Sequence, residues 1–171
     1  MIDAAILPLQ RRLMQPPAEA LVRLGVRADQ ITIAGLLIGL GAAAAAAAEL
    51  YMLALMGLLL NRLADGLDGA VARLTQPTDR GAFLDIALDF VFYATFPLGF
   101  ALADPGANAL PAAVLLASFV LSGTSFLAFS VIADRRGLKA RKYPTKGIYY
   151  LGGLTEGAET IAFFAAFCLF P

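Results

Sequence analysis

Four of the five aspartates between residues 65 and 89 lie within apolar sequence, and these four constrain the fold more than any other feature of the sequence. They are Asp65, Asp68, Asp85 and Asp89. On two helices, the first pair at i, i+3 and the second pair at i, i+4 each share one helix face. A short loop would make these helices antiparallel neighbours. Four carboxylates at the edge of a bilayer would repel one another unless divalent cations lay between them, so the pattern predicts a two-metal site.

The composition is that of an integral membrane protein. Of the 171 residues, 60% are hydrophobic and 15% are charged. The 13 basic and 13 acidic residues balance, so only their placement is informative about partners. The sequence has no histidine, which excludes a Ser-His-Asp triad and a histidine metal site. Cys168 is the single cysteine, so no internal disulfide forms. Without histidine, carboxylates would carry out acid-base catalysis and oxygen atoms would bind metals.

Residues 1–28 are predicted to form a cytoplasmic interfacial segment before the first membrane helix. Four apolar residues recur there at helical spacing, namely Ile2, Ile6, Leu9 and Leu13. Polar residues occupy the positions between them, which is typical of a short amphipathic helix lying on a membrane surface. We expect Pro16 and Pro17 to end this helix. A frayed basic terminus is the alternative.

The remaining residues, 29–171, are predicted to form a helical bundle with five visible transmembrane helices. The expected helices cover about 31–47, 51–74, 80–103, 109–132 and 148–170, with a turn at 104–108. Asp29 is the predicted N-cap of the first of them, because its side chain can accept from the free amides of the first turn. Gly35 and Gly39 form a small-xxx-small pair that would pack closely against a helix of this subunit or of a partner. The whole chain is thus predicted to be one all-α membrane domain.

The placement of the positive charges predicts an orientation. All thirteen Lys and Arg residues fall on one side of the expected topology, whereas the connections around Glu49 and at 104–108 carry none. The positive-inside rule then places the N-terminus, the aspartates and the basic loop at 134–146 in the cytoplasm. We therefore expect an integral protein of the inner, cytoplasmic membrane whose site opens to the cytoplasm.

The residues between the aspartates complete a longer motif. It reads Asp65-x-x-Asp68-Gly69-x-x-Ala72-Arg73, followed by Gly81-x-x-x-Asp85-x-x-x-Asp89. This motif resembles the signature of the CDP-alcohol phosphotransferase (CDP-alcohol phosphatidyltransferase) family. The resemblance implies six membrane helices, of which five are visible here. The sequence departs from the family pattern in two places, because the loop from 74 to 80 is one residue shorter and Ala28-Asp29 replaces a Pro-Asn pair before Thr32.

The resemblance also implies an activity and residue roles. Family members use two divalent ions, Mg²⁺ or Mn²⁺, to transfer a substituted phosphoryl group from a CDP-alcohol to a hydroxyl, with release of CMP. Asp65, Asp68 and Asp85 would bind metal, and Asp89 would act as the general base and also contact a metal. Donor binding would involve Gly69, Ala72, Arg73, Gly81 and Thr32. We expect CDP-diacylglycerol as the donor and a small polar alcohol as the acceptor, in phospholipid biosynthesis.

The acceptor half of the site is predicted from residues outside the motif. Glu156 and Glu159 share a helix face, and they either line an acceptor pocket or pair with Arg62 and Lys146. We group Arg62, Glu156 and Glu159 as candidate acceptor-pocket residues. The basic cluster at 135–146 would attract anionic lipid headgroups or bind an anionic acceptor.

Other functions fit part of the pattern. The aspartates could form structural ion pairs with Arg62, Arg73 and Arg80, although intramembrane carboxylates are costly and usually functional. A cation transporter would place its acids near the bilayer midplane on broken helices. A catalytically silent scaffold subunit would keep the fold without turnover. We further expect a homodimer that contacts membrane lipids and no nucleic acid.

Overall fold

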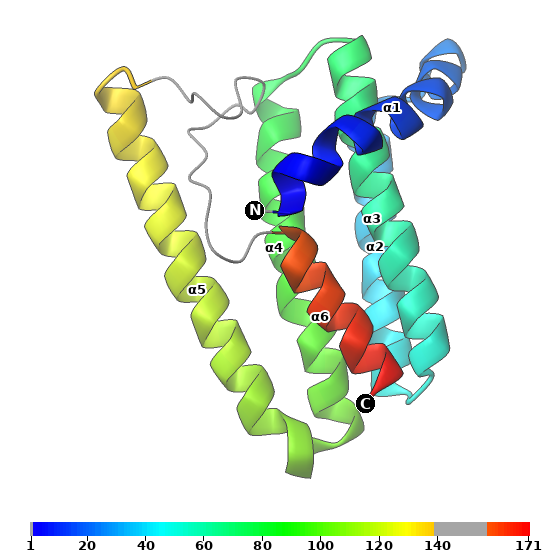
Figure 1. Cartoon of the computed structure of the whole chain (residues 1–171), viewed down its shortest axis with the longest axis vertical. Coiled ribbons are helices and arrows are strands. Elements are labelled where there is room, and N and C mark those ends of the chain that lie inside the picture. Colours follow the sequence, from blue (N-terminus) through cyan, green and yellow to red (C-terminus); the bar gives the residue numbers. More distant parts are fainter. Residues whose placement is uncertain (1, 139–156) are drawn as a thin grey trace.

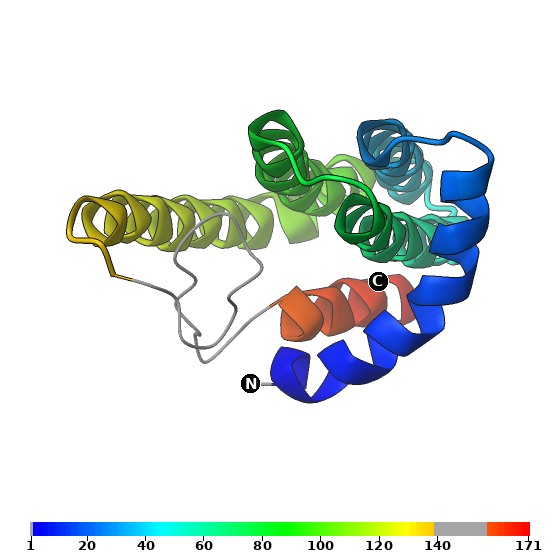
Figure 2. The same ribbon diagram turned by 90° about the horizontal axis from the view of Figure 1, so that it is seen from above.

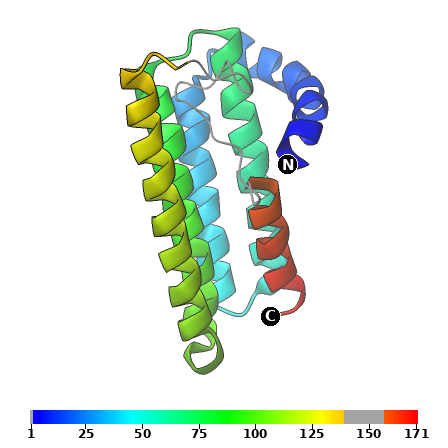
Figure 3. The same ribbon diagram turned by 60° about the vertical axis from the view of Figure 1, so that its left-hand side comes forward.

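The computed structural model describes residues 2–138 and 157–171, and in this part of the chain the protein is helical without strands (Figure 1). The helices are α1 (Ile2–Arg23), α2 (Ala28–Ala47), α3 (Tyr51–Leu74), α4 (Asp79–Ala103), α5 (Pro105–Arg135) and α6 (Gly157–Leu169). Figure 3 shows α2 to α5 running along the long axis, with α1 crossing one end. The predicted all-α fold class is confirmed.

The membrane-spanning character lies mainly in α2, α4 and α5. Among the described residues, these three helices are long and apolar enough to cross a bilayer, and α6 is a shorter apolar helix. α3 has 24 residues, enough to span a bilayer, but its second half carries the charged residues of the motif. Because α3 packs along α2, it lies at the same depth. The protein is therefore an integral membrane protein.

α1 is longer than predicted, since it continues through Pro16 and Pro17 to Arg23. The prediction that these prolines end the helix is wrong. Each proline removes one backbone donor and bends the helix, and Figure 2 shows α1 curving around one side of the bundle. Ala18, which directly follows them, is fully buried against Ala70 and Val71 of α3. This packing holds α1 in place as a helix on either side of the bend.

The start of α2 differs from the predicted one. The helix begins at Ala28 with Arg27 as its N-cap, so the prediction of Asp29 as N-cap is wrong. The Gln30 side-chain oxygen accepts a hydrogen bond from the Arg27 backbone N–H at 2.9 Å, which starts the helix earlier. Asp29 lies in the first turn, where its Oδ2 is 3.4 Å from Nε of Arg80.

The connection between α4 and α5 is tighter than the predicted turn at 104–108. α5 begins at Pro105, immediately after Asp104, because Pro is well suited to the first helical position and the Asp104 carboxylate accepts from the Ala107 N–H at 3.1 Å. α5 then extends to Arg135, beyond the predicted end at 132. Most of the predicted basic loop and the first part of the helix predicted at 148–170 lie outside the described residues.

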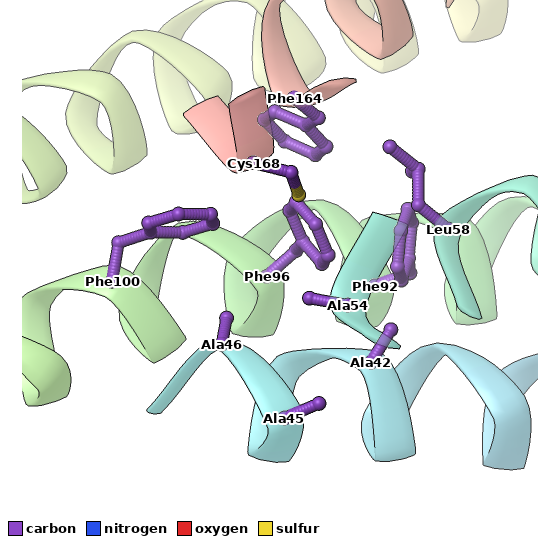
Figure 4. Packing of buried hydrophobic residues seen from close by; sticks show 10 residues of the cluster. All are labelled: Ala42, Ala45, Ala46, Ala54, Leu58, Phe92, Phe96, Phe100, Phe164 and Cys168. Carbon is purple, nitrogen blue, oxygen red and sulfur yellow. The ribbon is translucent and has the colours of Figure 1, made fainter. Parts of the chain in front are cut away.

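The hydrophobic core lies along α4 and α6, away from the α3–α4 connection. Figure 4 shows four phenylalanines packed against small residues of α2 and α3. They are Phe92, Phe96, Phe100 and Phe164. The Phe96 and Phe164 rings stack with centroids 5.0 Å apart. Large rings against alanines bring the helix backbones close together, which is how membrane helices gain packing energy.

Gly35 and Gly39 face the interior of this subunit. A Cβ at Gly35 would lie 3.0 Å from Cβ of Ala64 on α3, and a Cβ at Gly39 would lie 2.6 Å from the Phe92 ring on α4. The sequence left open whether Gly35 and Gly39 pack against this subunit or a partner subunit. In the structure they pack against helices of their own chain. This packing sets the close approach of α2 to the two helices that carry the aspartates.

Candidate active site

Three of the four motif aspartates come together where α3 ends and α4 begins. Asp65, Asp68 and Asp85 each offer one carboxylate oxygen, and these oxygens lie within 4.8 Å of one another. The spacings in each helix turn the side chains to a shared face, and the short connection between the helices makes them antiparallel neighbours. This is a set of hard oxygen ligands, the type that Mg²⁺ and Mn²⁺ prefer.

Asp68 is the most deeply placed member of this cluster. Its residue is 5% exposed, and its Oδ2 has no hydrogen-bond partner in the described part of the chain. A buried carboxylate oxygen without a partner is costly, and a bound cation would satisfy it. The residues present therefore fit a divalent ion.

A small cavity of about 20 Å³ joins these aspartates to the rest of the site. Its lining comes from α2, α3 and α4 and comprises Thr32, Gly35, Leu36, Asn61, Arg62, Asp65, Asp68, Asp85, Leu88 and Asp89. Such a volume holds one water molecule or ion and not a nucleotide. A donor molecule would therefore lie outside it, with only its reacting phosphates at the mouth.

Asp89 lines the cavity but is bonded differently from the cluster. Its Oδ1 accepts a hydrogen bond from Nη2 of Arg62 at 2.9 Å. Nη1 of the same guanidinium lies 3.8 Å from Oδ2 of Asp65. Arg62 thus contacts two of the motif carboxylates directly. The ion pairs expected if the aspartates had only a structural role are therefore present for Asp65 and Asp89.

Asn61 is a residue of the site that the sequence reasoning missed. Its Nδ2 donates to the Gly35 carbonyl at 2.8 Å, and its Oδ1 accepts from Nε and Nη2 of Arg62 at 2.8 and 2.6 Å. Asn61 is 4% exposed. A polar side chain directly after the apolar run 58–60 was the available signal, because buried polar groups in a membrane helix require partners.

The predicted donor-binding residues lie around the cavity, and only Thr32 lines it. Thr32 donates its hydroxyl to the Ala28 carbonyl at 3.1 Å. A Cβ at Gly69 would lie 3.2 Å from Nη1 of Arg73, which places the exposed Arg73 guanidinium beside this glycine. Ala72, which lies between these two residues in the sequence, is half-buried. This surface of α3 combines a cation with small side chains.

Gly81 lies at the start of α4, where that helix meets α2. Its N–H donates to the Thr78 hydroxyl, the N-cap of α4, at 3.0 Å. A Cβ added here would lie 3.2 Å from that hydroxyl and 3.5 Å from Oδ1 of Asp29. Because Gly81 has no side chain, the Thr78 cap can form and the start of α4 can lie close to Asp29 of α2.

The helix α1 covers α3 next to the aspartates. A Cβ at Gly66 would lie 2.9 Å from Nε2 of Gln10 and 3.5 Å from Met14. On the neighbouring face of α1, Leu9 and Leu13 are 59% and 58% exposed. The helix therefore packs one face on the site and presents apolar side chains outward, as the predicted interfacial helix requires.

The predicted acceptor residues are only partly described. Glu159 lies in the first turn of α6, is half-buried and does not line the cavity. Glu156 and its predicted partner Lys146 lie outside the described residues. Arg62 is therefore the one candidate acceptor residue that the described structure brings to the cavity.

The chain belongs to the CDP-alcohol phosphatidyltransferase family, whose model matches residues 26–170. This confirms the resemblance seen in the motif, and the family implies a CDP-alcohol donor and an alcohol acceptor. The chain is similar to "Inner membrane protein YnjF" of Escherichia coli (strain K12), with 47% identity over 171 residues that cover 100% of this chain and 83% of the relative. It is also similar to an "Uncharacterized protein" of Aquifex aeolicus (strain VF5), with 33% identity over 165 residues that cover 89% of this chain and 73% of the relative. No solved structure matches the chain.

Proposed function

We propose that the protein transfers a phosphatidyl group from CDP-diacylglycerol to a hydroxyl of a small polar acceptor, with release of CMP and with two divalent ions, Mg²⁺ or Mn²⁺. The observation that carries this proposal is the cluster of three carboxylates within 4.8 Å, placed by a family motif and containing a buried oxygen without a partner. Carboxylates alone would repel a pyrophosphate, so this cluster serves the reaction as a metal site.

Asp65, Asp68 and Asp85 would hold the ions. Bound divalent ions neutralise a pyrophosphate and stabilise the leaving phosphate oxygen. Arg73, exposed beside Gly69, would bind a donor phosphate at the cavity mouth, where small side chains leave room for the nucleotide. These residues together orient the reacting phosphorus toward the cavity.

Asp89 would take the proton of the acceptor hydroxyl. It lines the same cavity as the metal cluster, yet it is not one of the three grouped carboxylates. A general base must lie near the reacting centre and keep an oxygen free to accept a proton. An acceptor entering next to Arg62 would meet both the base and a cation suited to a phosphate.

The site suits a lipid donor because it lies at one end of the bundle. α1, with its exposed Leu9 and Leu13, lies at this end, so an acyl chain in the bilayer and a nucleotide in water can meet there. Arg73, Arg80 and Arg135 lie at the same end, which favours a cytoplasmic orientation. Together with the similarity to an inner membrane protein of Escherichia coli, this supports an inner-membrane location. The homodimer stays a prediction.

The alternatives are less well supported. α3 and α4 run as unbroken helices through their aspartates, unlike the discontinuous helices typical of transporter sites. Structural ion pairing accounts for Asp89 and leaves Oδ2 of Asp68 without a partner. A silent scaffold would have no need of an intact metal cluster.

The test is CMP release by the purified full chain with Mg²⁺, CDP-diacylglycerol or a soluble CDP-alcohol, and a panel of glycerol phosphate, inositol phosphate and serine. We expect CMP with CDP-diacylglycerol and one acceptor, and none with EDTA. Asp89→Asn should lower the rate about a hundredfold or more while the protein still binds Mn²⁺. Full activity of this variant would refute the base assignment. No turnover with any donor would favour the scaffold, and metal-dependent cation flux without CMP would favour the transporter.

A further inference from the structure

Arg62 lies where a cation between two of the carboxylates would lie. Nη2 is 2.9 Å from Oδ1 of Asp89, and Nη1 is 3.8 Å from Oδ2 of Asp65. The side chains of Arg62, Asp65 and Asp89 are 17%, 34% and 30% exposed, so the charges interact in a partly desolvated site. One guanidinium therefore bridges an aspartate of the metal cluster and the proposed base.

We infer that Arg62 is an exchangeable internal cation, which holds Asp89 until a second divalent ion displaces it from that carboxylate. The inference rests on the two-metal reaction proposed above. It adds a residue that regulates occupancy of the second site, a role that the family motif does not contain because Arg62 precedes its first residue.

The grouping of the carboxylates supports this assignment. Asp65, Asp68 and Asp85 come within 4.8 Å of one another, and Asp89 does not belong to this group. A first ion held by these three carboxylates would leave the 2.9 Å contact between Arg62 and Asp89 in place. An ion between Asp65 and Asp89 would have to compete with the guanidinium for the same oxygens. The two ions should consequently bind with unequal affinities.

The environment of Arg62 allows it to leave Asp89 and stay in the site. Asn61 accepts two hydrogen bonds from the guanidinium and is itself bonded to the Gly35 carbonyl. Cζ of Arg62 also lies 4.9 Å from the Phe92 ring centroid and 5.6 Å from that of Tyr93. These ring faces and the amide oxygen bind a cation without using a carboxylate. A small swing would thus free Asp89 without exposing Arg62 to lipid.

The direct test is a Mn²⁺ titration of the purified full chain, with free Mn²⁺ followed by its electron paramagnetic resonance signal. We expect two affinity classes in the wild type. Arg62→Gln should tighten the weaker class about tenfold, because the competing charge is gone, and should change the tighter class much less. Arg62→Lys should give an intermediate shift, since one ammonium cannot bridge both carboxylates while bonding Asn61.

Arg80→Gln is the matched control, because it removes a positive charge from an exposed ion pair near the same end of the bundle. It should leave both Mn²⁺ affinities unchanged. Equal affinities in wild type, Arg62→Gln and Arg62→Lys would overturn the inference, as would a weaker second class in Arg62→Gln. If Arg62→Gln does not fold, Arg62→Lys provides the test, and an unchanged affinity of its weaker Mn²⁺ class would overturn the inference.

The outcome separates this inference from the proposed function. A Mn²⁺ shift in Arg62→Gln together with no CMP release by the wild type from any donor would refute the proposed transferase activity and keep the role of Arg62. CMP release by the wild type together with unchanged Mn²⁺ binding in both variants would refute the role of Arg62 and keep the activity.

Discussion

The two ends of the bundle use the same helices in opposite ways. At one end, phenylalanines of α4 and α6 fill the space against alanines of α2, with Phe96 and Phe164 stacked at 5.0 Å. At the other end, carboxylates from α3 and α4 surround a cavity of about 20 Å³, and Oδ2 of Asp68 has no partner among the described residues. One end is closely packed with apolar side chains, whereas the other brings like charges together around a cavity.

This difference indicates which end stabilises the protein. Lipid is as apolar as the helices, so association of helices in a bilayer depends on close packing, which the aromatic end provides. The carboxylate end contributes repulsion, relieved only in part by Arg62. Substitutions at the aromatic end should therefore lower stability, whereas substitutions at the carboxylate end should lower activity.

The largest expected effect is the loss of activity in Asp68→Asn. CMP release should fall about a thousandfold, because the buried ligand of the proposed metal site is lost. The melting temperature without Mg²⁺ should stay the same or rise, since an unpartnered buried charge is removed. A melting temperature lowered as much as by a core substitution would contradict the division between the two ends.

Next in size is the loss of stability in Gly57→Leu. A Cβ at Gly57 would lie 2.6 Å from Cβ of Ala42 and 3.2 Å from its Cα, so α2 and α3 would have to separate. We expect about 3 kcal/mol of destabilisation, measured by thermal unfolding in detergent. Gly41→Leu is the control, because a Cβ there meets nothing within 4 Å. Equal losses in both variants would refute the packing argument.

A loss of stability of similar size is expected for Phe164→Ala. Phe164 is 1% exposed inside the aromatic core, and its removal should cost about 2–4 kcal/mol of unfolding free energy. The neighbouring Phe163 is 62% exposed, so Phe163→Ala should cost less than about 0.5 kcal/mol. Both variants should bind Mn²⁺ like the wild type; a changed affinity in Phe164→Ala would show that the two ends are coupled.

The smallest effect is expected for Arg80→Gln. This side chain is 74% exposed, and its ion pair with Asp29 at 3.4 Å lies in water-accessible surroundings. Such pairs contribute less than about 0.5 kcal/mol. Thermal unfolding should therefore hardly change, whereas a clear loss of stability would mean that the α2–α4 contact depends on this pair.

Much of the fold could be predicted from sequence patterns. α3 has the predicted bounds of 51–74, and α4 begins at Asp79, one residue before the predicted start, because apolar runs end at strong turn signals there. The grouping of Asp65, Asp68 and Asp85 followed from helical spacing and a short loop. Family membership followed from the motif and is confirmed.

The details that depend on contacts between distant residues could not be predicted. α1 continues past Pro16 because Ala18 packs on α3, and no local pattern reports that contact. The pairing of Arg62 with Asp89 depends on how α3 and α4 are rotated about their axes and on the anchoring of Asn61 to Gly35. Sequence spacing alone places Arg62 near several aspartates, and it does not show which of them forms the ion pair.

The contact of Gly57 with Ala42 has a consequence for the axial register of the helices. A slide of α3 along α2 by one residue would shift its aspartates by about 1.5 Å. Metal ligands tolerate errors of only about 0.2 Å in their bond lengths. Since a Cβ at Gly57 would already overlap Ala42, the two helices interlock at this point and resist sliding. A contact between a glycine and an alanine thereby limits the sliding of the helix that carries Asp65 and Asp68.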